Sequence, residues 1–127
     1  MGRVAIIEDS EDTLEVLQLI LAKYHQCTPF KDGEEFLAVF RVGSFDLILL
    51  DLIMPGLDGF EILRHIQQKD KELPVVALTA KAEPAEREKA LRAGFCDYFV
   101  KPIIDVSEFL TALDRHMGRC ANPPMAD

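Results

Sequence analysis

The chain has 127 residues, of which 49% are apolar and 28% are charged. These values are typical of a soluble globular protein and exclude a fibrous repeat or a wholly disordered chain. At about 100–200 residues per domain, the length predicts one domain over residues 1–120, with residues 121–127 as a short tail or the start of a linker. The 14 basic and 22 acidic side chains give a net charge of −8, which argues against direct binding to nucleic acid or to an anionic membrane.

The sequence also bears on where the protein works. Its apolar runs, such as Leu47–Leu50, are far shorter than the roughly 20 residues that cross a bilayer, and its N-terminus lacks the apolar core of a signal peptide. The cysteines Cys27, Cys96 and Cys120 form no Cys-x-x-Cys pair, so we expect reduced thiols. These features favour a cytoplasmic protein.

In chain order, the first element is a short apolar strand over residues 4–7. A helix follows, with Ser10 as its N-cap and an apolar stripe that begins at Leu14 and extends to Tyr24. Residues 26–30 form a weak strand that contains Pro29. Because proline cannot donate a ladder hydrogen bond, we expect this strand at an edge of the sheet.

The next elements follow the same alternation. Asp32 is the expected N-cap of a second helix that buries Phe36 and Phe40, and residues 45–50 form an almost wholly apolar strand. A turn at Pro55-Gly56 leads into a third helix that buries Phe60, Leu63 and Ile66 and runs up to the charged loop over residues 69–72, and a fourth strand spans residues 74–78.

The last elements are a helix, a strand and a helix. The helix over residues 84–93 offers little beyond Leu91 and alanines for burial, so we expect it to be the most weakly anchored of the set. Residues 98–100 form a short strand, and Asp105 caps a final helix that we expect to end at Gly118. Five strand–helix units in succession predict an α/β fold with three layers and a five-stranded parallel sheet.

Polar side chains follow the strands at the points where they end. Glu8 and Asp9 follow the first strand, Asp51 the third, Thr79 the fourth and Lys101 the fifth. Because parallel strands end at the same edge of a sheet, we expect three carboxylates, a hydroxyl and an ammonium group to meet there. A cluster of carboxylates needs a counter-charge, and Mg²⁺ prefers oxygen ligands of this kind.

These segments resemble the response-regulator receiver domain, the CheY-like module of two-component signalling. The resemblance covers about residues 3–118 and rests on four motifs in order: Ile6-Ile7-Glu8-Asp9, Leu49 through Gly59, Leu78-Thr79-Ala80, and Asp97 through Pro102. It implies a flavodoxin-like sheet with strand order 2-1-3-4-5. Glu8 stands where an Asp is more often found in the family.

The resemblance implies a role for each residue that matches a motif. Asp51 is the expected phosphoacceptor, and Lys101 and Thr79 are expected to stabilise the phosphoryl oxygens, with Tyr98 moving as a switch. The implied Mg²⁺ ligands are Glu8, Asp9, Asp51 and the backbone carbonyl of Ile53. In the family, the positions of Ile53 and Lys81 tune how long the phosphoryl group persists.

The implied phosphodonor is a sensor histidine kinase or a histidine phosphotransfer protein, and the implied recipient is a downstream effector or a second copy of the chain. The domain then acts in signalling and is not itself an enzyme. The alternative is a protein-interaction scaffold of the same fold that works without phosphorylation. An aspartyl-phosphate hydrolase would need an acid where Ile53 stands, and the acids of residues 8–12 would repel the phosphate of a flavin. We interpret His25, His65 and His116 as ordinary helix or loop residues.

Overall fold

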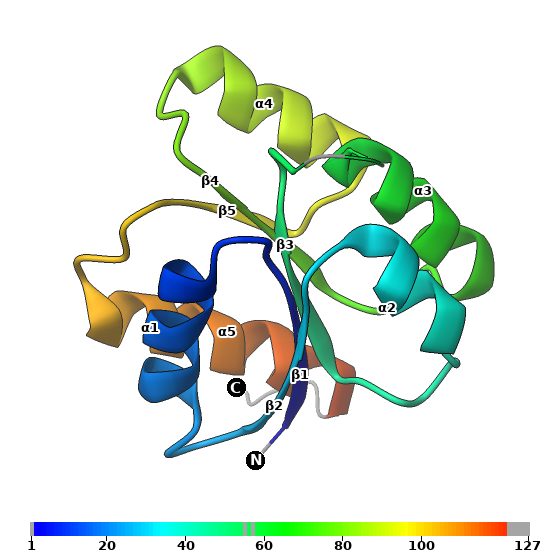
Figure 1. The fold of residues 1–127 in the computed structure, drawn as a ribbon, viewed down its shortest axis with the longest axis horizontal. Helices are drawn as coiled ribbons and strands as arrows, with labels where there is room; N and C mark the ends of the chain where they lie inside the picture. Colours follow the sequence, from blue (N-terminus) through cyan, green and yellow to red (C-terminus); the bar gives the residue numbers. More distant parts are fainter. Residues whose placement is uncertain (1, 55, 57, 122–127) are drawn as a thin grey trace.

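The computed structural model describes residues 2–54, 56 and 58–121, and in these residues strands and helices alternate along the chain (Figure 1). Pro55, half of the expected Pro55-Gly56 turn, lies outside them. The elements are β1 (Arg3–Ile7), α1 (Glu11–Leu21), β2 (Gln26–Phe30), α2 (Gly33–Val39), β3 (Leu47–Asp51), α3 (Gly59–Lys69), β4 (Val75–Thr79), α4 (Pro84–Ala93), β5 (Asp97–Val100) and α5 (Val106–Ala121).

The described strands form one parallel sheet in the order β2-β1-β3-β4-β5. This order confirms the predicted topology and places Pro29 on an edge strand, as expected. The register sets Ile7 beside Leu50 and Thr79 beside Val100. The ends of β1, β3, β4 and β5 therefore meet along one edge of the sheet.

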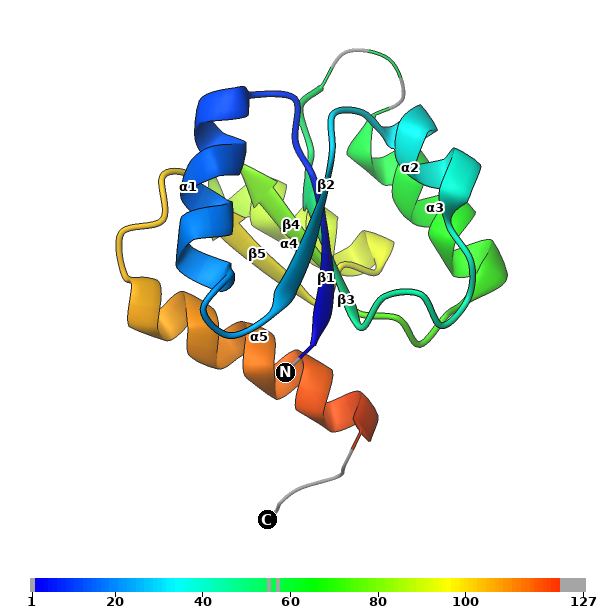
Figure 2. The same cartoon turned by 60° about the horizontal axis from the view of Figure 1, so that its bottom comes forward.

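Helices cover both faces of the sheet, so the fold has the three expected layers (Figures 1 and 2). Alternate strand residues face opposite sides, and each side has its own apolar cluster. Side chains such as Ile48 and Ile62 form the cluster under α2, α3 and α4. Leu49 and Phe109 belong to the cluster under α1 and α5. Burial on both faces explains why β3 is apolar along nearly its whole length.

Polar side chains fix where several helices begin. Ser10 and Asp32 accept the backbone N–H groups of the first turns of α1 and α2, and Asp105 does the same for α5, as the sequence predicts. The sequence analysis did not identify the N-cap of α3. Asp58 and Glu61 form a reciprocal capping box there, with Asp58 accepting the N–H of Glu61 at 2.9 Å.

Three expectations about helices were wrong. α1 ends at Leu21, and Tyr24 lies beyond it with 53% of its surface exposed. Leu91 is 40% exposed, because α4 turns Ala90 toward the sheet instead. α5 continues through Gly118 to Ala121, since glycine weakens a helix without forcing it to end. Within the described residues, no helix has both the length and the apolar character needed to cross a membrane.

The three histidines lie in helices or loops, as expected. His65 is exposed on α3. His25 and His116 are 7% and 6% exposed, and each ring lies 3.0 Å from a carboxylate. His25 contacts Asp114 of α5, and His116 of α5 contacts Asp97 of β5. These contacts tie α5 to His25, which precedes the edge strand β2, and to Asp97, the first residue of the edge strand β5.

The α2 side of the core provides a stability test. Phe36 is fully buried between the rings of Phe30 and Phe40, whose centroids lie 5.2 and 5.1 Å away. We expect Phe36→Ala to lower the free energy of unfolding by about 3–5 kcal/mol, because it leaves a cavity. Val39 lies on the same helix and is 55% exposed, so Val39→Ala should cost less than about 1 kcal/mol. Urea denaturation measures both; equal losses would contradict this assignment of the core.

Candidate functional site

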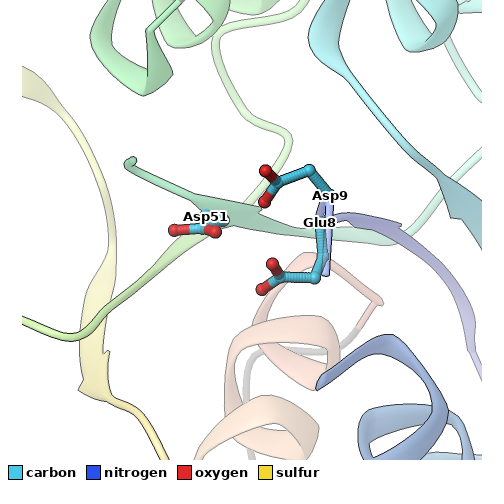
Figure 3. Close-up of side chains that lie close together, drawn as sticks. All are labelled: Glu8, Asp9 and Asp51. Atoms are coloured by element: carbon cyan, nitrogen blue, oxygen red, sulfur yellow. The ribbon is translucent and has the colours of Figure 1, made fainter. Parts of the chain in front are cut away.

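Three carboxylates gather where β1 and β3 end (Figure 3). Glu8 and Asp9 follow β1 directly, and Asp51 is the last residue of the adjacent strand β3. One oxygen from each of the three lies within 4.8 Å of the others. Glu8 and Asp51 are buried, whereas Asp9 is exposed. The prediction that these three side chains lie close together is therefore confirmed.

Lys101 reaches this cluster from the end of β5. Its Nζ donates to Glu8 Oε1 at 3.0 Å and to Asp51 Oδ2 at 3.1 Å. The backbone N–H of Lys101 donates to the carbonyl of Thr79 at 2.8 Å, which holds the residue beside the end of β4. One ammonium group thus faces three carboxyl groups, and the site retains an excess of negative charge when all are ionised.

Glu8 carries the strongest electrostatic perturbation in the cluster. The pKa of its carboxyl group is raised from 4.5 to about 7, because burial and the nearby Asp51 together outweigh the hydrogen bonds from Ser10 and Lys101, which lower it. For Lys101, burial opposes the charged form, but the bonds to Glu8 and Asp51 dominate and raise the pKa of its ammonium group. Lys101 therefore remains positively charged at neutral pH.

Asp51 is held by two different donors. Its Oδ1 accepts the backbone N–H of Ile53 at 3.1 Å, and its Oδ2 accepts from Lys101. The side chain is 3% exposed, and its neighbour Ile53 is 53% exposed. These contacts fix the orientation of the Asp51 carboxylate beside the other two acids.

Thr79 and Tyr98 meet through the peptide groups of Lys81. The N–H of Lys81 donates to Thr79 Oγ1 at 3.2 Å, and the hydroxyl of Tyr98 donates to the carbonyl of Lys81. Thr79 and Tyr98 are 1% and 4% exposed. The loop between β4 and α4 thus links a side chain at the strand edge to an aromatic ring in the core.

Several backbone contacts of this site were not predicted from the sequence. The N–H of Ser10 donates to Glu8 Oε2 at 3.1 Å, and the N–H of Ile53 and the peptide groups of Lys81 make the contacts described above. Every residue type except proline has such an N–H, so no residue pattern distinguishes these positions.

The donor set fits Mg²⁺. This cation takes oxygen ligands and leaves room for water or phosphoryl oxygens, and the cluster offers three carboxylates, one of them exposed. The single ammonium of Lys101 leaves negative charge for a divalent cation to balance. The residues that could hold the ion are therefore Glu8, Asp9 and Asp51.

The sequence-family model of the response regulator receiver domain matches residues 4–114 of the chain. The chain belongs to this family. Receiver domains are the signalling domains of response regulators in two-component systems, and the acidic cluster of this one fits Mg²⁺ binding and phosphorylation.

Curated relatives of this receiver domain are response regulators. The chain is 38% identical over 101 residues to the transcriptional regulatory protein ResD of Bacillus subtilis. The aligned residues are 79% of this chain and 42% of ResD. It is 36% identical to the transcriptional regulatory protein PcoR of Escherichia coli, over 80% of the chain and 46% of PcoR. The chain spans about half the length of the curated relatives it matches.

Solved receiver domains share the fold. The non-phosphorylated HemR receiver domain from Leptospira biflexa superposes with a TM-score of 0.84 at 31% identity, over 98% of this chain and 99% of that one. The receiver domain of the sensor histidine kinase PA1611 from Pseudomonas aeruginosa gives 0.82 at 30% identity, over 92% of this chain and 98% of that one. The PA1611 structure holds a magnesium ion coordinated in its active-site cleft.

The raised pKa of Glu8 predicts pH-dependent stability in protein kept in a chelator. Between pH 4.5 and about 7 the folded state keeps a proton that the unfolded state releases. The free energy of unfolding should therefore fall as pH rises through this window, by roughly 3 kcal/mol from this group.

Glu8→Gln removes this contribution, so urea denaturation at pH 5 and pH 8 should show that wild type loses stability relative to the variant as the pH rises. Glu11→Gln is the control, because the Glu11 side chain is 80% exposed. A stability difference between wild type and Glu8→Gln that is the same at both pH values would contradict the assignment.

Proposed function

We propose that this receiver domain accepts a phosphoryl group on Asp51 and transmits the change to a partner. The donor is the phosphohistidine of a sensor histidine kinase or of a histidine phosphotransfer protein, or a small acyl phosphate. Lys101 and Thr79 assist the transfer, and Tyr98 takes part in the switch.

The contact of Lys101 with Asp51 carries this proposal. Its Nζ lies 3.1 Å from Asp51 Oδ2, at a strand edge where three acids converge. An ammonium group at this distance can bind a phosphoryl oxygen once Asp51 is phosphorylated. Stabilising charge on the phosphoryl oxygens is the main catalytic requirement of phosphoryl transfer.

The chemistry is a displacement at phosphorus. An oxygen of the Asp51 carboxylate forms the new bond to phosphorus, the bond from phosphorus to the donor nitrogen or oxygen breaks, and the donor leaves with the electron pair. The product is an aspartyl phosphate. Lys101 neutralises the oxygens of the transferring group, and the hydroxyl of Thr79 donates a hydrogen bond to one of them.

Mg²⁺ completes the proposed site. Its ligands are Glu8, Asp9, Asp51 and the backbone carbonyl of Ile53. The convergence of the three carboxylates and the magnesium ion in the PA1611 receiver domain support this assignment. When bound, Mg²⁺ supplies positive charge that offsets the repulsion between the acids and the incoming phosphoryl oxygens.

Transmission uses the contacts around Lys81. A phosphoryl group adds about two negative charges at the site, and in this proposal the hydroxyl of Thr79 turns toward it and gives up the N–H of Lys81. Tyr98, whose hydroxyl bonds the carbonyl of Lys81, responds to the same movement. The surface formed by α4, β5 and α5 is then altered for a downstream effector or for a second copy of the chain.

We also propose the bounds of the domain, its class of activity and the place where the protein works. The receiver domain occupies residues 1–120. Of the expected tail or linker over residues 121–127, Ala121 still belongs to α5, and residues 122–127 lie outside the described residues. The domain assists its own phosphorylation and dephosphorylation without being an enzyme for another substrate. It works in the cytoplasm, and neither nucleic acid nor a membrane binds it directly.

Intact-mass spectrometry tests the phosphoacceptor. With acetyl phosphate and Mg²⁺, we expect wild type to gain one phosphoryl group, because Asp51 is aligned by Ile53 and Lys101. Asp51→Asn should gain none, and chelation of Mg²⁺ should reduce the yield strongly. Asp12→Asn, a nearby exposed acid in the first turn of α1, is the matched control and should behave as wild type. Failure of wild type to form an adduct with acetyl phosphate or a histidine kinase would instead favour a phosphorylation-independent scaffold.

Ile53 offers a test of phosphoryl lifetime. Its apolar side chain cannot orient an attacking water, so we expect slow to moderate hydrolysis of the aspartyl phosphate. Ile53→Asn supplies a polar group and should speed the decay at least about threefold, since positioned polar groups accelerate such steps. The side chain is 53% exposed, so the fold should tolerate the change. Ile53→Leu is the control; equal decay of the two phosphorylated variants would contradict the prediction.

A further inference from the structure

α4 is attached to the body of the domain with little apolar burial. The structure describes every residue of α4, and among them only Ala90 is buried. By contrast, α3 buries Ile62, Leu63 and Ile66. A helix that buries so little apolar surface depends on other contacts for its position.

Lys89 makes one such contact with the neighbouring helix α3. Its Nζ lies 4.9 Å from the centroid of the Phe60 ring, within the range of a cation–π interaction. Phe60 is held in turn by Phe95, whose ring packs edge-to-face at 5.7 Å and is 2% exposed. The ring under Lys89 is thus fixed to the core, while Lys89 itself is exposed.

The other polar contacts of α4 are weaker or local. Arg87 donates to the carbonyl of Tyr98 at 3.4 Å, which is long for a hydrogen bond. Arg92 pairs with Glu88 one turn away on the same helix, so this pair does not join α4 to anything else. Lys89 is therefore the charged side chain through which α4 contacts a fixed group on α3.

α4 follows the Lys81 loop closely in the chain, so the Lys89–Phe60 contact resists movement that begins in that loop. α4 begins at Pro84, shortly after Lys81, whose peptide groups bind Thr79 and Tyr98. We propose that the Lys89–Phe60 contact is a latch that ties α4 to α3 and sets how readily α4 departs from its place when the Lys81 loop moves. The use of the latch in signalling rests on the proposed function, but its existence does not.

Hydrogen exchange of the α4 backbone amides tests the latch in the untreated protein. Lys89→Met keeps an unbranched side chain of good helix propensity and removes the charge. We expect it to speed exchange in α4 about two- to fivefold, as expected for an exposed cation–π contact. Lys89→Arg should retain the wild-type rate. Arg92→Met removes a charge of the same sign and breaks only the Glu88–Arg92 pair within α4, so it should speed exchange less than Lys89→Met, by about twofold at most. Amides of β3 report whether the whole fold is affected and should not change.

A double-mutant cycle identifies the partner of Lys89. Phe60→Leu removes the ring, and Lys89→Met added to it should cause no further acceleration. If Lys89→Met speeds α4 exchange as much in the Phe60→Leu background as in wild type, the latch is wrong. It is also wrong if Lys89→Met and Arg92→Met give equal α4 exchange rates.

A parallel measurement separates the latch from the proposed function. Acetyl phosphate and Mg²⁺ are added, and the mass adduct and the exchange of α4 are followed together. An adduct on wild type without faster α4 exchange in untreated Lys89→Met would refute the latch and leave the phosphoacceptor intact. Faster exchange in untreated Lys89→Met without any adduct would support the latch and refute its phosphorylation-dependent use.

Discussion

The two hydrogen bonds of Lys101 hold together the buried carboxylates at the edge of this sheet. Its Nζ lies about equally far from Glu8 and Asp51, at 3.0 and 3.1 Å, and these carboxylate side chains are 0% and 3% exposed. A buried carboxylate without a partner costs several kcal/mol, so the fold must keep the end of β5 close to the ends of β1 and β3. The raised pKa of Glu8 shows that this compensation is incomplete.

The parallel sheet meets this requirement through its register. Ile7 lies beside Leu50 and Thr79 beside Val100, so the residues that follow these strands meet at one edge. The cost of crowding acids at this edge is offset elsewhere, by two apolar clusters that cover the sheet on both faces. The site is therefore electrostatically unfavourable by itself and is imposed by the apolar packing on the two faces of the sheet.

The contrast between the apolar packing and the charged site explains which features the sequence could predict. Strand and helix periods depend on apolar spacing, and strand ends follow from it, so the alternation of elements and the convergence of the acids were predictable from the residues. The strand order 2-1-3-4-5 came from the family resemblance. The exposure of Leu91 was not, because α4 has too few apolar residues to define one face. Nor was the pairing of His25 with Asp114, which lies 89 residues away. Backbone donors such as the N–H of Ser10 carry no residue signature, so they too were missed.

The two helices beside β5 differ in how they are held. α5 buries Phe109 and Leu113 and is tied by His–Asp contacts to residues next to or within both edge strands. α4 relies on Ala90 and on side chains such as Lys89 that reach outward to a neighbour. A displacement that begins at the loop between β4 and α4 meets less resistance in α4, because fewer buried contacts must be broken there. The surface shared by α4, β5 and α5 thus has one firmly anchored helix and one lightly held helix, and the lightly held one is directly connected to the site.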